Sequence, residues 1–287
     1  MPLYLIENSS MMYRMFYGLP PMARPSDNHP VNVAHGCATA FWRLVRQHPS
    51  HVAVVMDKGK SEARVALSPA YKAQRKPPHM DLIRQIPFAK HAAQAFGFAI
   101  VERQGVEADD LIATHTRLAL EQGHEVVIVS TDKDMMQLIG PSVIMFDPLK
   151  NRPVTADDVT IKFGCPPEKL GDLLAMTGDA ADNIEGMKGV GPKKAAALLE
   201  RFGDLEAVID AADQIVQPQL REAVKRDAWK ARLARKLVTL DMHVDVSETV
   251  SDFAYSGFDT RSVLDFLDEM ELVTLRQEIA TGMMEAA

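Results

Sequence analysis

Short apolar runs alternate with longer amphipathic stretches through residues 1–160. The apolar runs are rich in β-branched side chains and cover Leu3–Ile6, Val52–Met56, Phe98–Val101, Val126–Val129 and Val143–Phe146. Apolar residues at helical spacing lie between them, at Val31–Gln47, Asp81–Phe96 and Ala108–Gln122, and Ser9 or Ser10 can cap a first short helix. Strands and helices in alternation predict a parallel α/β sheet.

Beyond Thr155 the strand pattern stops and only helical spacing remains. We expect helices at Ala156–Phe163, Pro167–Met176, Pro192–Phe202, Leu205–Ala211, Gln219–Thr239, Thr260–Glu269 and Leu272–Thr281. The chain therefore divides into an α/β core at residues 1–160 and a helical region at residues 161–287, two units that can share one cleft.

The stretch from Lys58 to Met80 fits neither pattern. It is basic, it contains three prolines, and it has no sustained periodicity. Loops of this length inside a compact domain are often functional.

Composition indicates a soluble globular protein, with 47% hydrophobic and 25% charged residues among 287. Cys37 and Cys165 form no disulfide framework or zinc-ligand spacing, which favours a reducing cytoplasm. No apolar run approaches the roughly 18 residues that a membrane span needs, and the start of the chain lacks the layout of a signal peptide.

The net charge of −7 is not typical of a nucleic-acid binder. The basic residues are nevertheless concentrated in two segments: Lys58, Lys60, Arg64, Lys72, Arg75 and Lys76 after the second run, and Lys225, Arg226, Lys230, Arg232, Arg235 and Lys236 on a late helix. A solvated helical face is an equally good interpretation of the second group.

Carboxylates follow the ends of four apolar runs. They are Glu7, Asp57, the group Glu107, Asp109 and Asp110, and the pair Asp132 and Asp134. Ligands bind outside the carboxyl ends of strands in parallel sheets, and like charges gathered there repel unless cations neutralise them. Oxygen ligands without His or Cys suit Mg²⁺ or Mn²⁺. The pattern therefore predicts a metal-dependent enzyme.

Each acidic segment also has a simpler interpretation. Acids at the start of a helix favourably oppose its dipole, but three acids between Glu107 and Asp110 exceed what a cap requires; we expect Glu107 and Asp109 in the cleft and Asp110 on a water or the helix. The Asp132–Asp134 segment can be a plain strand-to-helix turn.

We expect two ion sites. Asp179 and Asp182 are three residues apart and can share a helical face. Together with Asp132 and Asp134 they would form a second site beside a first one of Glu7, Asp57, Glu107 and Asp109. Two ions about 3.5–4 Å apart serve displacement at phosphorus, where one generates a hydroxide nucleophile and the other stabilises the leaving oxygen.

The segment Gly186–Ala196 predicts a phosphate-binding hairpin. Gly189 and Gly191 permit a tight turn, and Pro192 suits the first position of a helix whose free N–H groups can bind an anion. Lys188, Lys193 and Lys194 add positive charge. Such a helix-hairpin-helix grips DNA phosphates without reading bases. A simple interhelical turn is the alternative, and the Walker pattern is absent.

Tyr71, Lys72 and Arg75 lie in the irregular basic stretch. Lys72 and Arg75 can offset charge that develops on a scissile phosphate, although solvated surface cations are the simpler interpretation.

Taken together, the chain resembles the 5′-nuclease family, which comprises the 5′–3′ exonuclease domain of bacterial DNA polymerase I and the flap endonucleases. The motifs that match are Ser9–Pro21, Asp57–Lys60 with Arg64, Tyr71–Arg75, Gly105–Asp110, Asp132–Asp134, Gly178–Asn183 and Gly186–Lys193. The chain has no polymerase domain, so we expect a stand-alone or excised nuclease.

The resemblance implies a PIN-like, Rossmann-like parallel-sheet core with a helical arch at 58–96, and a helix–three-turn–helix region with its hairpin at 184–202. It implies Mg²⁺- or Mn²⁺-dependent hydrolysis of DNA at 5′ ends and 5′ flaps by a monomer, with two or more ions, in replication and repair. It also implies a potassium ion at the hairpin, DNA contacts from Arg14, Arg64 and Tyr71, and arch cations at Lys72 and Arg75.

One departure concerns the first acid. Relatives carry Asp-Gly where this chain has Glu7-Asn8, so the carboxylate must sit differently, and Asn restricts a turn that needs positive φ. A catalytically impaired DNA-binding protein of the same fold is therefore a second hypothesis. A PIN-like ribonuclease is a third.

Overall fold

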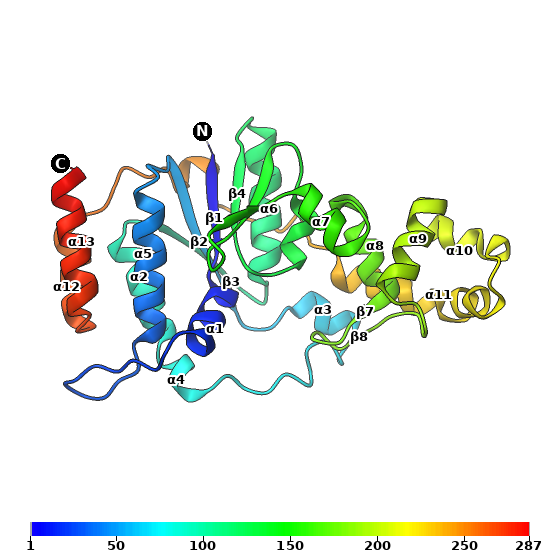
Figure 1. The fold of residues 1–287 in the computed structure, drawn as a ribbon, viewed down its shortest axis with the longest axis horizontal. Coiled ribbons are helices and arrows are strands. Elements are labelled where there is room, and N and C mark those ends of the chain that lie inside the picture. Colours follow the sequence, from blue (N-terminus) through cyan, green and yellow to red (C-terminus); the bar gives the residue numbers. More distant parts are fainter. Residues whose placement is uncertain (1, 287) are drawn as a thin grey trace.

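The sheet forms the centre of the computed structural model, which describes residues 2–286 (Figure 1). Its strands are β1 (Leu3–Glu7), β2 (His51–Lys58), β3 (Ala99–Gln104), β4 (Val126–Val129), β5 (Val143–Asp147) and β6 (Arg152–Val154). They lie in the order β3-β2-β1-β4-β5-β6, with the first five parallel and β6 antiparallel to β5. The predicted parallel sheet is confirmed. The strand β6 was not predicted, because its three residues carry Arg and Pro rather than an apolar run.

Helices cover both faces of this sheet, and alternate side chains of each strand supply the two cores. Leu3 and Leu5 pack towards α6 (Ala108–Glu121), whereas Tyr4 and Ile6 pack on the opposite face. The opposite layer contains α1 (Asn8–Gly18), α2 (Asn32–Val45) and α5 (Ile86–Ala95). The result is a helix–sheet–helix arrangement with its carboxyl strand ends free.

Five further helices pack on the α6 side of the sheet and reach away from it, towards the yellow end of Figure 1. We call these five helices the helical extension. They are α7 (Ala156–Phe163), α8 (Pro167–Thr177), α9 (Pro192–Phe202), α10 (Leu205–Asp210) and α11 (Pro218–Val238). A hairpin of two-residue strands, β7 (Gly178–Asp179) and β8 (Ile184–Glu185), interrupts them. The predicted helices are confirmed within one or two residues, but the short hairpin lay in a region where only helices were expected.

The last two helices return to the core. Both α12 (Thr260–Glu269) and α13 (Val273–Ala286) pack in the layer of α2 and α5, at the opposite end of the molecule from α9–α11 (Figure 1). The predicted helical region thus does not pack as one unit, and the division at residue 160 stays a prediction.

The basic stretch after β2 is partly helical. Ser61 caps α3 (Glu62–Leu67) by accepting a hydrogen bond from the Arg64 N–H at 3.2 Å, and an irregular segment then runs to α4 (Met80–Ile83). The single helix expected at Asp81–Phe96 is divided into α4 and α5, because Pro87 occupies the first turn of α5. Figure 1 shows this segment crossing below the carboxyl ends of the strands, where an arch was expected.

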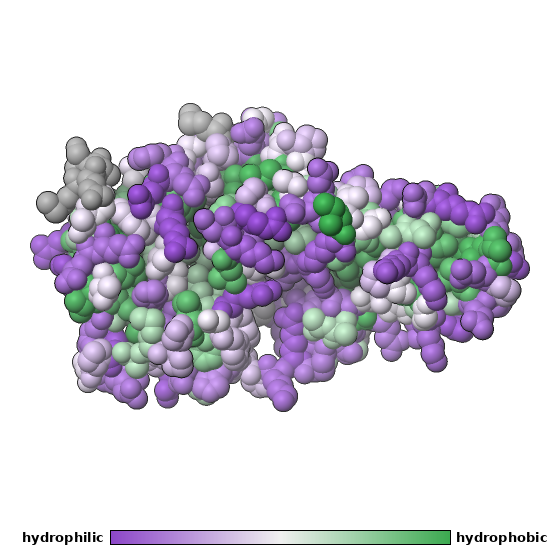
Figure 2. All heavy atoms as spheres, viewed as in Figure 1, coloured by the Kyte–Doolittle hydropathy of each residue, from purple (hydrophilic) through white to green (hydrophobic). Residues whose placement is uncertain are grey.

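The remaining short helices are 3₁₀ segments at Asp134–Leu138, Ala212–Gln214 and Val250–Phe253. Hydrophilic residues cover most of the face seen in Figure 2, over both the core and the helical extension. Within residues 2–286, no helix has the length and apolar character that crossing a membrane would require.

Candidate active site and nucleic-acid interface

The strand order reverses between β1 and β4, and the acidic residues meet at this point of the sheet edge. Crevices for ligands form at such switch points in open α/β sheets. A direct contact joins the two strand ends, since the Ser130 hydroxyl donates to Glu7 Oε2 at 3.0 Å. The sheet topology thus brings together acids that are 125 residues apart in sequence, Glu7 and Asp132.

Glu7 ends β1 and also caps α1. Its Oε1 accepts a hydrogen bond from the Ser10 N–H at 2.7 Å, and its Oε2 accepts from the Ser10 hydroxyl. The predicted cap at Ser9 or Ser10 is therefore wrong, and the carboxylate just before them takes that role. Burial raises the pKa of Glu7 to about 7, against these hydrogen bonds, and the charges of Asp132 and Asp57 raise it further.

Asn8 is the first helical residue of α1 and has no positive φ. The expected restriction of the turn therefore does not occur. The side chain is fully buried; its Oδ1 accepts from the Cys37 thiol at 3.7 Å, and its Nδ2 has no hydrogen-bond partner.

A first group of mutually repelling acids surrounds Asp109. Burial raises the pKa of Asp109 well above its usual value, and Glu7, Asp132 and Asp57 raise it further. Asp57 is exposed, and its Oδ1 accepts from the Ala108 N–H at the start of α6, at 2.8 Å. We call Glu7, Asp57, Asp109 and Asp132 the first acidic group.

A second group surrounds Asp134. Burial raises the pKa of Asp134 to about 7, together with the charges of Asp132, Asp179 and Asp182. Its Oδ1 is buried without a hydrogen-bond partner, and the Lys133 ammonium lies 3.9 Å away. We call Asp132, Asp134, Asp179 and Asp182 the second acidic group. Asp132 belongs to both groups, as a residue between two ion sites would.

The position of Asp179 and Asp182 differs from the expectation. Asp179 ends β7 and Asp182 lies in the turn before β8, so they do not share a helical face. Lys133, which the sequence interpretation passed over between two acids, forms an ion pair with Asp179. Although burial opposes it, the charges of Asp134 and Asp179 hold the pKa of Lys133 above its usual value.

Two other predicted ligands are occupied by cations of the protein. The Arg64 guanidinium lies 2.8 Å from Glu107 Oε2 and 2.5 Å from Asp110 Oδ2. It also donates to the carbonyl oxygens of Leu237, at 2.8 Å, and Thr239, at 3.1 Å. Arg64 is 6% exposed. Arg64 thus lies in a buried ion pair with Asp110, and the roles predicted for the two residues in DNA and water binding stay predictions.

Lys72 and Arg75 approach the acids from the segment between α3 and α4. Lys72 Nζ lies 2.7 Å from Glu107 Oε1 and 3.5 Å from Asp182 Oδ2. Arg75 Nη2 lies 2.5 Å from Asp182 Oδ1. Although burial opposes both shifts, these contacts raise the pKa of Lys72 and lower that of Glu107. In this structure Glu107 thus contacts the cations Lys72 and Arg64, and its role as a ligand of the first ion site stays a prediction.

Hydrogen bonds fix the turn that carries Lys72 and Arg75 to Asp182, just before β8, and to Glu107. The Lys72 N–H donates to the Asp182 carbonyl at 2.9 Å, with Lys72 at φ 52°. The Tyr71 hydroxyl donates to Glu107 at 3.0 Å and to Asp182 at 3.3 Å. Tyr71 is 6% exposed and its hydroxyl supports the acids, while its predicted DNA contact stays a prediction.

The donor set fits a hard divalent ion in its chemistry. It consists of oxygens, burial and then the repulsion between acids raise the pKa values of Glu7, Asp109 and Asp134, and one carboxylate oxygen of Asp134 has no hydrogen-bond partner. Its side chains are not preassembled, because within residues 2–286 no three His, Cys, Asp or Glu side chains are arranged to hold a metal ion.

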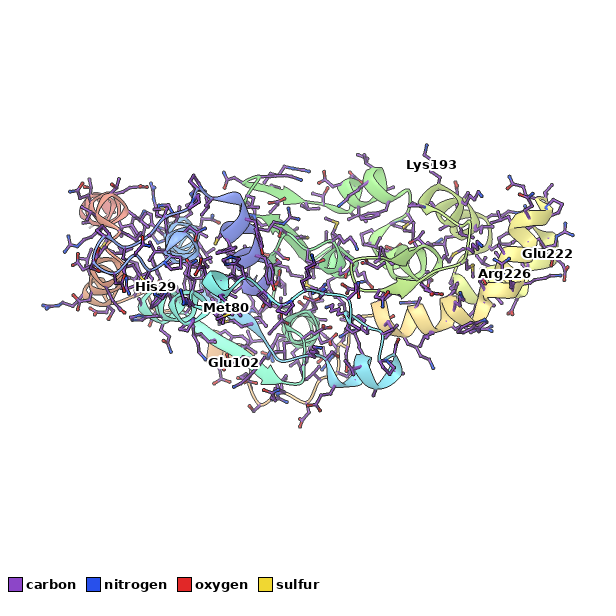
Figure 3. All side chains as sticks on the ribbon, turned by 90° about the horizontal axis from the view of Figure 1, so that it is seen from below. His29, Met80, Glu102, Lys193, Glu222 and Arg226 are labelled. Atoms are coloured by element: carbon purple, nitrogen blue, oxygen red, sulfur yellow. The ribbon has the colours of Figure 1, made fainter. Side chains whose placement is uncertain are left out.

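The predicted glycine-rich hairpin, Gly186–Ala196, follows the strand pair β7–β8 and leads into α9. Gly189 adopts φ 83°, Gly191 caps α9 and Pro192 is its first residue. The Lys188 N–H donates to Asp227 Oδ2, and the Lys194 ammonium donates to the Gly189 carbonyl, both at 2.8 Å. Lys193 projects from the start of α9 into solvent (Figure 3).

The basic face of α11 is largely neutralised. Its cations form ion pairs with acids of the extension: Lys225 with Asp213, Arg226 with Asp227, Lys230 with Glu185, Arg232 with Glu206 and Arg235 with Asp172. Neither a free DNA-binding stripe nor a purely solvated face describes this helix.

Two family models together match residues 2–261 of the chain. Residues 2–164 match the family model of the 5′–3′ exonuclease N-terminal, resolvase-like domain, and residues 165–261 match that of the 5′–3′ exonuclease C-terminal SAM fold. The chain belongs to the 5′–3′ exonuclease family.

Two relatives of this 5′–3′ exonuclease family member differ greatly in length. The chain is 39% identical over 286 residues to DNA polymerase I of Rhizobium leguminosarum, covering 97% of the chain but 28% of that polymerase. It is 32% identical over 278 residues to a 5′–3′ exonuclease of Aquifex aeolicus, covering 96% of the chain and 94% of that protein.

A solved structure has the same fold. The bacteriophage T5 flap endonuclease, in a pseudo-enzyme–product complex with DNA and metal ions, superposes with a TM-score of 0.70 at 21% identity. The match covers 98% of this chain and all of that one. The expected PIN-like core with a helical C-terminal region is confirmed.

Proposed function

We propose that this exonuclease-family protein is a structure-specific 5′ nuclease that hydrolyses DNA at 5′ ends and 5′ flaps with divalent metal ions. The observation that carries the proposal is the pair of acidic groups sharing Asp132 at the switch point of the sheet, beside the Lys72–Arg75 turn. The T5 enzyme solved with DNA and metal ions supports the same class of ligand.

Mg²⁺ or Mn²⁺ would be held by the first and second acidic groups, with Asp132 serving both. When bound, such ions supply an activated water and stabilise the leaving oxygen. Lys72 and Arg75 are the candidate catalytic cations, since each lies on an acid of this edge and can turn to a phosphate. Lys133 positions Asp179.

DNA would be held by both the core and the helical extension. The proposed contacts are Arg14 on the exposed side of α1 and the hairpin residues Lys188, Gly189, Gly191, Lys193 and Lys194. A potassium ion at the hairpin carbonyls would compete with the Lys194 ammonium for the Gly189 carbonyl. The protein would act as a monomer in the cytoplasm, consistent with its two free, buried cysteines.

The decisive experiment uses a labelled 5′-flap DNA with product sizing, over a range of Mg²⁺ and Mn²⁺. Cleavage near the flap junction or from the 5′ end is the expected result. Absence of cleavage at every metal concentration would refute the proposal. The same flap made of RNA decides the ribonuclease alternative, which requires the RNA flap to be cut faster.

Asp134→Ala separates ion binding from DNA binding. It removes the orphaned, buried carboxylate oxygen from the second acidic group, so we expect cleavage to fall about 100-fold or more while DNA affinity changes little. Equal loss of both, measured by flap cleavage and by fluorescence anisotropy, would contradict the assignment.

A catalytically impaired DNA-binding protein is the second candidate. It is favoured by Glu7, whose carboxylate oxygens are both engaged by Ser10 or Ser130. DNA binding without cleavage by the intact chain, followed by cleavage in Glu7→Asp, would establish it.

A further inference from the structure

A cavity of about 340 Å³ lies beside the acids at the strand ends, with Thr131 in its wall. It is bounded by α1, by Thr131 in the segment after β4, by the β5–β6 hairpin and by α7. Four basic residues line it, Arg14, Lys150, Arg152 and Lys162, against the two acidic residues Asp147 and Asp158. Since one water occupies roughly 30 Å³ of liquid, this volume admits a phosphate group.

The cations of this cavity are only partly neutralised. Lys150 lies 3.7 Å from Asp147, and Arg152 lies 3.0 Å from Asp158. Among the residues that the structure describes, Arg14 and Lys162 have no ion pair with an acid, and Lys162 instead lies over the ring of Phe163, with Nζ 4.8 Å from the centroid. The lining therefore carries excess positive charge in a chain of net charge −7.

Crowding of these cations is visible in Lys162. Burial lowers its pKa, and Lys150, Lys133 and Arg14 lower it further by repulsion. An anion among these groups would relieve that repulsion, as metal ions would relieve it among the carboxylates.

The cavity is continuous with the acidic edge. Thr131 lines it, and its hydroxyl lies 3.4 Å from that of Ser10, which contacts Glu7. The charge of Asp132, one of the acids at the strand ends, also acts on Lys162 in the cavity, where it raises the pKa of the ammonium. A DNA strand with its scissile phosphate at the acids would carry another of its phosphates here.

We propose that the cavity lined by Arg14, Lys150, Arg152 and Lys162 binds a phosphate group of the DNA on which the acidic edge acts. The site rests on the proposed nuclease function and extends it by a phosphate contact separate from the acidic groups and the hairpin before α9. Its ligand is either a terminal 5′-phosphate or an internal phosphodiester, which share the same chemistry.

The test is the salt dependence of DNA binding by Lys162→Met in the full chain, measured by anisotropy with a chelator present. Met keeps an aliphatic stem over Phe163 and removes the charge from an exposed position, so folding is preserved. We expect about threefold to tenfold weaker binding, and a slope of log K against log salt that is shallower by about one.

Arg261→Met is the matched control, because Arg261 is an exposed cation on α12, at the far end of the molecule from α7 (Figure 1). It should leave the slope unchanged. Repeating both measurements with 5′-phosphorylated and 5′-hydroxyl DNA identifies the ligand: a loss confined to phosphorylated DNA assigns a terminal phosphate, and an equal loss on both assigns an internal one.

An unchanged slope in Lys162→Met, while the wild type binds and cleaves flap DNA, would overturn the cavity site alone. An equal change in Lys162→Met and Arg261→Met would overturn it too, because the effect would then come from net charge. No DNA binding by the wild type would overturn this site together with the proposed function.

Discussion

Glu7 serves as a helix cap and lies in the first acidic group. Its longer side chain reaches the N–H of Ser10 and accepts from Ser130, and its raised pKa of about 7 keeps it largely protonated below neutral pH. Both properties oppose its use as a metal ligand, because a ligand carboxylate must be deprotonated.

We therefore expect Glu7→Asp to cleave flap DNA several-fold faster at pH 7 with DNA affinity within about twofold, since Asp also caps helices well. Single-turnover cleavage and anisotropy measure the two quantities. Slower cleavage would show instead that the site is built around the length of Glu.

Asp134 gives a second prediction, for stability without divalent metal. A carboxyl group whose pKa rises from 3.8 to about 7 on folding stays protonated in the folded chain while the unfolded chain ionises. The free energy of unfolding therefore falls as pH rises from about 4 to about 7, and stays lowered above pH 7.

Asp134→Asn removes this loss. In EDTA we expect the variant to exceed the wild type in unfolding free energy by about 2 kcal/mol at pH 8 and to match it near pH 4. Urea unfolding at the two pH values measures both differences. A pH-independent difference between the proteins would mean that Asp134 is ionised in the folded state.

At the scale of elements, Arg64 joins three helices. It lies in α3, pairs with Glu107 and Asp110 at the start of α6, and donates to carbonyls at the end of α11. Arg64→Met leaves two buried acids without their cation, so we expect a loss of about 3 kcal/mol or more.

Chemical denaturation measures that loss, and Lys60→Met, at an exposed position of the same stretch, is the control. A stable Arg64→Met protein with weakened DNA binding would restore the surface contact first expected for Arg64.

Elements with a strong period could be predicted from sequence, and those set by tertiary contacts could not. The five apolar runs are the five parallel strands, because a strand buried on both faces needs continuous apolar residues. The three residues of β6 and the two-residue strands of the hairpin carry no such pattern. These short strands form through tertiary contacts, since β6 pairs with β5, and β7 pairs with β8 directly after α8.

The same distinction applies to the site. The acids at strand ends could be found because parallel strands place their carboxyl ends at one edge. Their partners could not, since nothing in the local sequence tells that Arg64 pairs inward with Asp110 while Lys72 lies on Glu107 and Asp182. Whether Arg64 and Lys72 are buried or exposed decides their roles, and this depends on how α3 and the turn after it pack against the rest of the protein.

At the scale of the whole molecule, the proposed function requires DNA to reach from the acids at the strand ends to the helical extension. The hairpin before α9 is on that extension, and Lys193 is an exposed cation that projects from the ribbon in Figure 3. Lys188 and Lys194 also carry charge, but the Lys194 ammonium is held by the Gly189 carbonyl. Lys193 should thus contribute a phosphate contact that is independent of base sequence.

We expect Lys193→Ala to weaken binding to all DNA sequences alike and to make the slope of log K against log salt shallower by about one. Arg201→Ala, at the other end of the same helix, is the control and should leave the slope unchanged. Flap cleavage at saturating DNA should stay near wild type, because Lys193 contacts none of the acids. An unchanged slope would remove the hairpin from the DNA interface, and a fall in saturated cleavage would instead place Lys193 in the chemistry.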